Sequence, residues 1–176
     1  MKSTSQASKG GPTAPIRIAL LAAALAASVP SSSASDAFGA LIGTWRGEGQ
    51  VVFEGGQSER LSCNTYYVEK DKGLRLSLVI RCANASAGKI EMRGTLDHLD
   101  GKLTGTWEER TFNASGTATG GIAGNQIHLS FAGALNGTLT TLLTNDTQSI
   151  FVRSQGSTLS TINIVLKKLG AVQATK

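Results

Sequence analysis

Apolar and polar residues alternate along most of the chain after residue 41. In 42–53, one set of alternate positions holds Trp45, two glycines, Val51 and Phe53, and the other set is mostly polar. Successive side chains of a β-strand point to opposite faces, so this pattern predicts a strand with one buried face. Similar segments follow at 60–69, 74–82, 89–96, 102–110, 114–122, 126–132, 137–144, 148–154 and 158–167. Short turns rich in Gly, Asn and Asp separate them, which predicts about ten consecutive strands (eight to ten) and no helical segment.

A meander of this length has two edge strands with unpaired backbone groups, and pairing the last strand with the first removes both edges. We therefore expect an all-β fold, a single antiparallel up-and-down β-barrel. The faces expected to point outward carry many charges: Arg75, Arg81, Lys89, Glu91, Arg93, Lys102 and Glu108. An outer-membrane barrel needs an apolar outward band, so we expect this barrel not to span a membrane.

The two cysteines indicate how the second and third strands pair. If Lys72 and Gly73 are the two residues of the turn, Cys63 lies directly opposite Cys82. A shift of one residue would place Cys63 opposite Arg81 and mismatch the buried faces. The sequence therefore predicts a Cys63–Cys82 disulfide, and the same counting places it at a hydrogen-bonded pair of the ladder.

The interior of the barrel offers candidate ligand contacts. Residues 114–122 (ASGTATGGI) hold almost no large side chain, so one wall leaves space. Either a bulky side chain from across the barrel, such as Trp45 or Trp107, or a bound ligand fills this space, and the sequence leaves both open. Glu109 is expected to point inward near a strand end, as a polar group in the lumen or at its rim. The candidate lumen residues are Trp45, Tyr67, Leu78, Met92, Trp107, Glu109 and Phe131.

Residues 1–34 have the organisation of a secretory signal peptide. Basic residues precede the apolar run 18–29 (IALLAAALAASV), and small residues follow it up to a predicted cleavage site after Ala34. The twelve apolar residues are fewer than the ~20 that a spanning helix needs, although a retained membrane anchor is the alternative. We expect a single barrel domain at 35–176, located in the periplasm or secreted, where two cysteines form a structural disulfide.

Removal of the signal peptide changes the charge of the protein. Three of the seventeen Lys and Arg lie in this segment (Lys2, Lys9 and Arg17) and none of the twelve Asp and Glu. The remaining chain has fourteen basic and twelve acidic residues, a net charge of +2. The basic residues are scattered among acidic ones, so we expect no nucleic-acid partner.

Residues able to perform catalysis are few. His98 is expected in the turn 97–100, and His128 on the outward face of a strand. Neither has a neighbour in the sequence that would form a catalytic pair. Asp97, His98 and Asp100 could bind a metal weakly, but a solvated turn is the expected interpretation. The sequence predicts no catalytic residue, no metal site and no cofactor.

The segment LIGTWRGEG at 41–49 resembles the first strand of calycin-type barrels, the group of lipocalin, fatty-acid-binding and nitrobindin-like proteins. It is most similar to the nitrobindin-like pattern, in which a Trp-x-Gly-x-Gly run starts a ten-stranded barrel. In the haem-binding members a Tyr-Pro pair follows and a histidine near the C-terminus ligates iron. Here Val52 and Phe53 stand at the Tyr-Pro position and no histidine follows His128. The resemblance thus implies the barrel and does not extend to the haem-binding residues.

The chain as a whole also resembles small exported barrels of bacteria. Two functions from different classes follow from the sequence. The first is a non-enzymatic barrel that binds a small hydrophobic ligand or a lipid in its lumen. The alternative is an envelope structural or protein-interaction factor, for example one resembling a protease inhibitor, with a packed core and an envelope protein as partner. A hollow or a filled lumen distinguishes them.

Overall fold

The computed structural model of the protein describes residues 34–84 and 88–170. The predicted signal peptide lies outside these residues, apart from Ala34. A helix, α1 (Ala34–Leu41), comes first, and a short 3-10 turn, η1 (Asp71–Gly73), lies between the second and third strands. The strands are Gly43–Phe53 (β1), Ser58–Lys70 (β2), Arg75–Asn84 (β3), Lys89–Leu99 (β4), Lys102–Glu109 (β5), Ala114–Ala123 (β6), Gln126–Gly133 (β7), Asn136–Thr144 (β8), Thr147–Gln155 (β9) and Leu159–Lys168 (β10).

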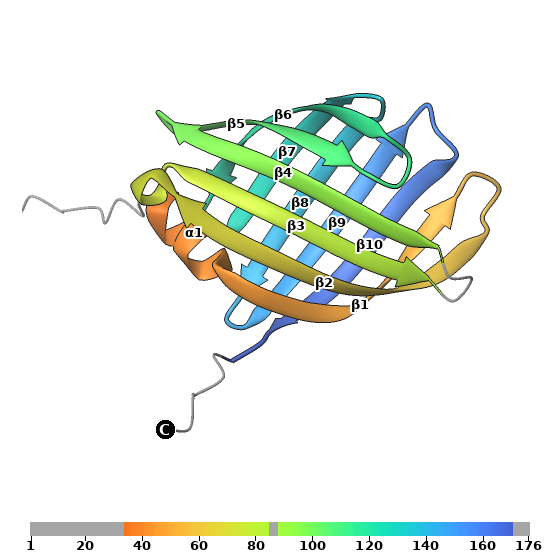
Figure 1. Ribbon diagram of the computed structural model, residues 1–176, viewed down its shortest axis with the longest axis horizontal. Helices are drawn as coiled ribbons and strands as arrows, with labels where there is room; N and C mark the ends of the chain where they lie inside the picture. The colour runs from red at the N-terminus through yellow and green to blue at the C-terminus, as the bar shows by residue number, and fades with distance from the viewer. Residues whose placement is uncertain (1–33, 85–87, 171–176) are drawn as a thin grey trace, which may run out of the picture. The chain divides into compact units, whose positions relative to one another are not determined.

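The ten strands form a closed antiparallel barrel in which each strand pairs with its neighbours in the sequence (Figure 1). The barrel closes where β1 pairs with β10, from Trp45 opposite Lys168 to Phe53 opposite Leu159. Along β2, β5 and β7, more buried and more exposed residues alternate as the sequence pattern requires. The predicted all-β, up-and-down barrel is confirmed.

Glycines in β1 allow the closure. A Cβ atom on Gly47 would lie 1.9 Å from the Val165 carbonyl oxygen, and one on Gly49 would lie 2.2 Å from that of Asn163. No other residue fits there without moving the backbone, so these glycines permit the close approach of β1 to β10. The Gly-x-Gly part of the opening motif is therefore a requirement of barrel closure.

The predicted register of β2 and β3 is confirmed, because Cys63 pairs with Cys82 and the two form a disulfide. The connection is longer than expected, since 71–74 form a four-residue loop that contains η1. This loop shifts the hydrogen-bonding pattern of the ladder by one pair. The Cα atoms of the cysteines are 4.1 Å apart, which fits a non-hydrogen-bonded pair, so the predicted hydrogen-bonded pair is wrong. Leu74, the first residue of the strand expected at 74–82, lies in the loop and is 56% exposed.

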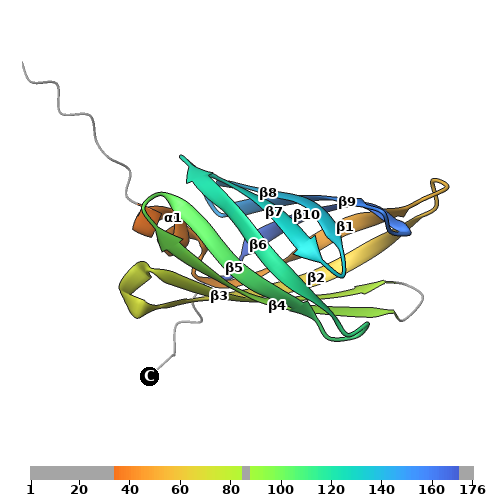
Figure 2. The same ribbon diagram turned by 90° about the horizontal axis from the view of Figure 1, so that it is seen from above.

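The prediction of no helical segment is wrong, because α1 covers one end of the barrel (Figure 2). Phe38 and Leu41 are buried, and Trp45 Nε1 donates a hydrogen bond of 2.7 Å to the Leu41 carbonyl oxygen. Lys168 Nζ donates to the Ala40 carbonyl oxygen at 2.9 Å. The barrel end is apolar and needs a cover, which two apolar residues three apart on a short helix provide. None of the described helices is long and apolar enough to cross a membrane.

Side chains fill the half of the barrel beneath α1. The largest fully buried ones include Trp45, Phe38, Leu76, Leu103 and Leu166. These residues come from α1 and from strands far apart in the sequence, so they pack the lumen solidly at this end. We call this the α1 end, and the opposite end, which carries the β5–β6, β7–β8 and β9–β10 connections, the mouth.

Replacing both cysteines with alanine (Cys63→Ala and Cys82→Ala) is expected to lower the free energy of unfolding by about 3 kcal/mol. The physical reason is that the disulfide joins residues 19 apart and so restricts the unfolded chain. Urea titration of the variant and the wild type measures the difference, and reduced wild-type protein is the control. A loss below about 1 kcal/mol would contradict this entropic account.

Candidate functional site

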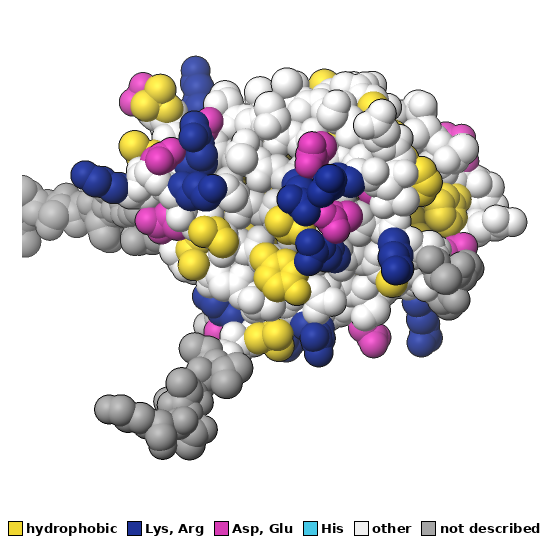
Figure 3. All heavy atoms as spheres, viewed as in Figure 1, with side chains coloured by type: hydrophobic (Ala, Val, Ile, Leu, Met, Phe, Trp, Pro, Cys, Tyr) yellow, Lys and Arg dark blue, Asp and Glu magenta, His cyan; other side chains and the backbone are white. Residues whose placement is uncertain are grey.

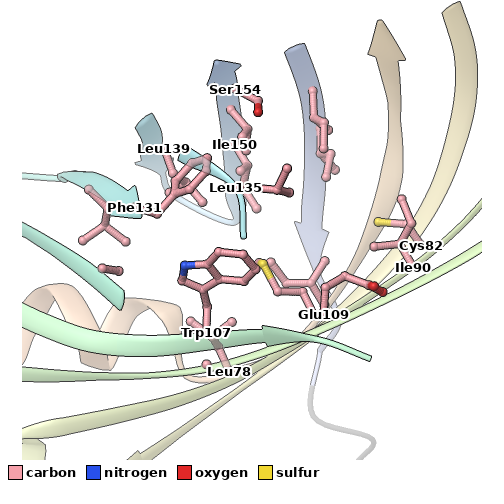
Figure 4. A pocket seen from close by; sticks show the side chains of 18 of the residues that line it. Leu78, Cys82, Ile90, Trp107, Glu109, Phe131, Leu135, Leu139, Ile150 and Ser154 are labelled. Atoms are coloured by element: carbon pink, nitrogen blue, oxygen red, sulfur yellow. The ribbon is translucent and has the colours of Figure 1, made fainter. Parts of the chain in front are cut away.

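The barrel contains an apolar cavity of about 220 Å³ in its mouth half (Figure 4). Its wall includes Ile90 of β4, Leu139 of β8 and Ile162 of β10, so the strands surround it. Residues next to the mouth connections also line it, among them Leu135 and Phe112. Since Phe112 is 74% exposed, the cavity reaches the surface at the mouth. None of the α1 residues whose side chains the structure describes (38–41) belongs to the lining.

Five of the seven candidate lumen residues line this cavity: Leu78, Met92, Trp107, Glu109 and Phe131. The structure brings them together from β3, β4, β5 and β7, as Figure 4 shows for all but Met92. Each points inward, on the face that the alternation predicts.

The other two candidates, Trp45 and Tyr67, lie outside the cavity lining. Trp45 is 0% exposed beneath α1. The Tyr67 hydroxyl and the Gln148 amide form a buried polar pair, in which Gln148 Nε2 donates to the hydroxyl at 2.9 Å. Burial raises the pKa of Tyr67, although the hydrogen bond with Gln148 acts in the opposite direction. Both residues point inward as predicted, but at the α1 end, because alternation determines the face of a residue and not its height along the barrel.

The thin wall of β6 is partly filled by Trp107, which comes from the adjacent strand β5 and not from across the barrel. Trp107 Nε1 lies 2.8 Å from the position that a Cβ atom on Gly116 would take. The ring also meets Phe131 edge to face, with centroids 6.1 Å apart. Trp107 Nε1 is buried without a hydrogen-bond partner. The ring of Trp107 thus fills part of this space from the adjacent strand, and an apolar cavity remains beside it.

Glu109 is the only charged residue among the described residues that line the cavity. Its carboxylate accepts backbone N–H groups of the polypeptide at both oxygens. Oε1 accepts from Glu91 at 3.0 Å and Thr111 at 3.1 Å, and Oε2 accepts from Phe112 at 2.6 Å. Burial by itself would raise the pKa of Glu109, but the backbone donors of Phe112, Glu91 and Thr111 outweigh it and lower the pKa. The carboxylate thus holds the β5–β6 turn in place, and its charge is already stabilised by protein donors.

The rest of the cavity wall is almost entirely apolar. Ser154 lines it, but its hydroxyl is 2.9 Å from that of Ser157. Thr95 and Thr106 also contribute to the lining, and their hydroxyl oxygens are 3.3 Å apart. These hydroxyl groups therefore have partners within the protein, and the site favours an uncharged, apolar guest.

Neither histidine lies in the cavity lining. His98, expected in a turn, is on β4 opposite Leu103, and its ring centroid is 6.4 Å from that of Phe38 at the α1 end. That expectation is wrong because β4 extends to Leu99. His128 is exposed, and its Nδ1 is 3.2 Å from the Thr140 hydroxyl. Within 34–84 and 88–170, no group of three or more His, Cys, Asp or Glu is placed to hold a metal ion.

Sequence reasoning missed the residues that form the mouth. Phe112 and Leu135 lie in connections, and Leu159 begins β10. A large apolar residue in a polar turn is the signal that could have indicated Phe112, because turns seldom carry one without a reason.

The sequence matches no protein-family model and no curated protein. Among solved structures, the crystal structure of Rv2717c from M. tuberculosis has a TM-score of 0.61 at 16% identity, over 78% of this chain and 98% of that one. The S-type phycobiliprotein lyase CPES from Guillardia theta has a TM-score of 0.49 at 8% identity, over 79% and 94%. A de novo designed fluorescence-activating β-barrel has a TM-score of 0.46 at 12% identity, over 76% and 98%. At these identities the similarity to Rv2717c shows the fold alone.

Glu109→Gln is expected to lower the free energy of unfolding by about 2 kcal/mol at neutral pH, since three backbone donors lose a charged acceptor. The folded-state pKa of Glu109 is lowered, so the advantage of the wild type is complete above the unfolded value of about 4.3 and is lost as the pH falls through the folded pKa. Urea titrations at neutral and acidic pH measure it.

The matched control for this prediction is Glu108→Gln, which changes the adjacent, exposed carboxylate on the outer face of β5. The expected loss for this control is less than about 0.5 kcal/mol. Equal losses of unfolding free energy for the two variants at neutral pH would show that the hydrogen bonds from the backbone to the Glu109 carboxylate do not stabilise the fold.

Proposed function

We propose that this protein is a non-enzymatic barrel that binds a small, uncharged hydrophobic molecule in its lumen. The observation that carries the proposal is the apolar cavity of about 220 Å³ within a barrel whose other half is solidly packed. A protein that needed only a stable core would gain stability by filling this space, since unfilled apolar volume destabilises a fold.

The volume of the cavity limits the size of the guest. A cavity of about 150 Å³ holds one benzene molecule, so 220 Å³ accommodates about ten non-hydrogen atoms. A bicyclic aromatic compound, a short branched chain or the end of a longer acyl chain meets this limit. A longer chain extends through the mouth past Phe112.

The chemistry of the wall supports binding over catalysis. The carboxylate of Glu109 is held by three backbone donors, and both histidines lie elsewhere. General acid–base or nucleophilic catalysis requires a reactive side chain positioned beside its partner at the guest. The lining residues that the structure describes offer apolar contact surface instead.

We also propose that the protein acts outside the cytoplasm. The signal-like segment 1–34 and the Cys63–Cys82 disulfide both support this location, because structural disulfides persist in oxidising compartments.

Protein recovered from the periplasmic fraction is expected to begin at Ser35, and its intact mass checks this. An intact residue 1 in the recovered protein would favour the retained anchor.

The test of ligand binding is to fill the cavity. Val152→Trp is expected to weaken the binding of naphthalene, a neutral ten-carbon probe, at least tenfold, because Val152 lines the cavity and indole occupies its volume. Equilibrium dialysis measures the affinity of the wild type and the variant. Saturable one-site binding is expected for the wild type.

Phe151→Trp provides the matched control, since the neighbouring residue of β9 is exposed on the outer face. This variant is expected to bind within about twofold of the wild type. Unchanged affinity of Val152→Trp, with its fold verified by circular dichroism, would refute binding in this cavity. Native mass spectrometry of the protein extracted from its own cells then shows whether a molecule remains bound.

A further inference from the structure

The mouth presents a large apolar side chain in a fixed position. Phe112 is 74% exposed, although it also forms part of the cavity wall. Its turn is not loosely held, because the Glu109 carboxylate accepts the N–H groups of Thr111 and Phe112. A buried charge therefore holds an exposed phenyl ring at the rim, an arrangement that burial of apolar surface within this chain does not explain.

Three arginines gather beside this turn, around the single carboxylate of Glu91. Arg93 Nη2 lies 2.7 Å from Oε1, Arg81 Nε lies 3.0 Å from Oε2, and Arg110 Nη1 lies 3.8 Å from Oε1. We call Arg81, Arg93 and Arg110 the arginine cluster. Hydrogen bonds from Arg93 and then from Arg81 lower the pKa of Glu91, so it is ionised at neutral pH. Figure 3 shows basic side chains beside acidic ones on this face, over β3 and β4.

The arginine cluster has more positive charge than the protein neutralises. Three guanidinium groups face the carboxylate of Glu91 and that of Glu108, which lies opposite Arg93 in the ladder, so the local charge is +1. Each guanidinium has five N–H donors, whereas one carboxylate has about four acceptor sites. All three side chains are between 41% and 57% exposed, so most of their donors face solvent. The cluster therefore fits a surface that carries many anionic oxygens.

The backbone of Glu91 joins the cluster to the mouth. Its N–H group donates to Glu109 Oε1, and its carbonyl oxygen accepts from the N–H group of Arg110 at 3.0 Å. Arg81 of β3, Arg93 of β4 and Arg110 of the β5–β6 connection thus surround the Glu91 side chain on the outer face. Phe112 follows Arg110 in the same connection, with its phenyl ring at the rim.

The α1 end also exposes an apolar side chain, but its arginine is paired differently. Leu99 is 70% exposed at the β4–β5 turn, next to Asp100 in the sequence and opposite Lys102 in the ladder. Nearby Arg75 binds two carboxylates, those of Asp97 and Asp71. Here one arginine contacts two carboxylates, whereas beside the mouth three arginines contact the carboxylate of Glu91. Of the two ends, as described by residues 34–84 and 88–170, only the mouth combines an exposed aromatic ring with a cluster of three arginines.

We propose that Phe112 and the arginine cluster dock the mouth of the barrel on an anionic lipid surface. This inference rests on the proposed function and deepens it, because a lipid phase is where a hydrophobic guest can enter or leave without crossing water. Each basic side chain near an anionic membrane increases affinity about fivefold, and an aromatic ring at the interface adds to this. The docking itself requires no guest.

The experiment measures flotation of the protein with vesicles of phosphatidylcholine, with and without phosphatidylglycerol. The full chain is expressed, and all variants carry the same N-terminus, as verified by intact mass. The wild type is expected to bind the anionic vesicles preferentially and to be released by salt. Arg81→Gln, Arg93→Gln and Arg110→Gln together are expected to weaken binding at least tenfold. Phe112→Ser alone is expected to weaken it about fivefold.

Matched variants at the α1 end control for general loss of charge or apolar surface. Lys70→Gln, Lys72→Gln and Lys102→Gln together remove three exposed basic charges, and Leu99→Ser removes an equally exposed apolar residue. Both controls are expected to bind within about twofold of the wild type. In addition, brominated phosphatidylglycerol is expected to quench the new fluorescence of Phe112→Trp and not that of Leu99→Trp, since only the mouth enters the lipid.

Equal binding to neutral and anionic vesicles, or equal losses at the two ends, would overturn the proposal. Binding to soluble polyphosphate without any binding to vesicles would overturn it too, and would assign the arginine cluster to a soluble polyanion. Because no guest is present in the vesicle assay, docking without naphthalene binding contradicts only the lumen function. Naphthalene binding without docking contradicts only the present inference.

Discussion

The backbones of β1 and β10 come so close at Gly47 that a methyl group on this residue would overlap the carbonyl oxygen of Val165. This contact closes the barrel, and the other features depend on closure. A closed barrel leaves no strand edge unpaired, and it directs every second side chain of ten strands into one lumen. The number of strands makes the lumen wide, so side chains alone need not fill it. The side chains that fill each half of the lumen then determine whether a cavity for a ligand remains.

The two halves of the lumen are filled in different ways. At the α1 end, Trp45 lies under Leu41 and binds its carbonyl oxygen, so the helix and the first strand cover the opening together. In the mouth half, β6 contributes mostly small residues, and Trp107 only partly compensates for them. The solid half provides the stability that the hollow half lacks, since unfilled apolar space destabilises a fold. A barrel of this kind can keep a cavity because its other end is well packed.

The sequence predicts the fold well because alternation determines which face of a strand is buried. The same alternation, with Cys63 and Cys82, predicts the β2–β3 register, since a shift by one residue would mismatch every side chain. It correctly points Leu78, Met92 and Phe131 inward, where they line the cavity. The position of a residue along the barrel axis cannot be predicted in this way. It depends on strand tilt and loop length, which an alternation with a period of two does not encode.

The same limit accounts for the features that the sequence did not indicate. Two large apolar residues on the eight-residue α1 are too few to show a helical period. The four-residue loop 71–74 has the same register as a two-residue turn but a different hydrogen-bonding parity, so counting cannot separate them. A large apolar residue in a polar turn could have indicated Phe112, but the contact that fixes its turn, with the carboxylate of Glu109, joins a strand to a turn and is not encoded in the pattern of polarity.

Glu91 and Glu109 show how the inside and the outside of this barrel are connected. Their side chains are on opposite faces of the sheet, one among arginines and the other beside the cavity, and the N–H group of Glu91 donates to the Glu109 carboxylate. Both carboxyl groups have a lowered pKa, so both interactions persist together as the solution becomes mildly acidic. A displacement of β4 at Glu91 would move the arginine cluster and the Phe112 turn at the same time. The outer charge and the rim of the cavity are therefore linked through one segment of backbone, that of Glu91.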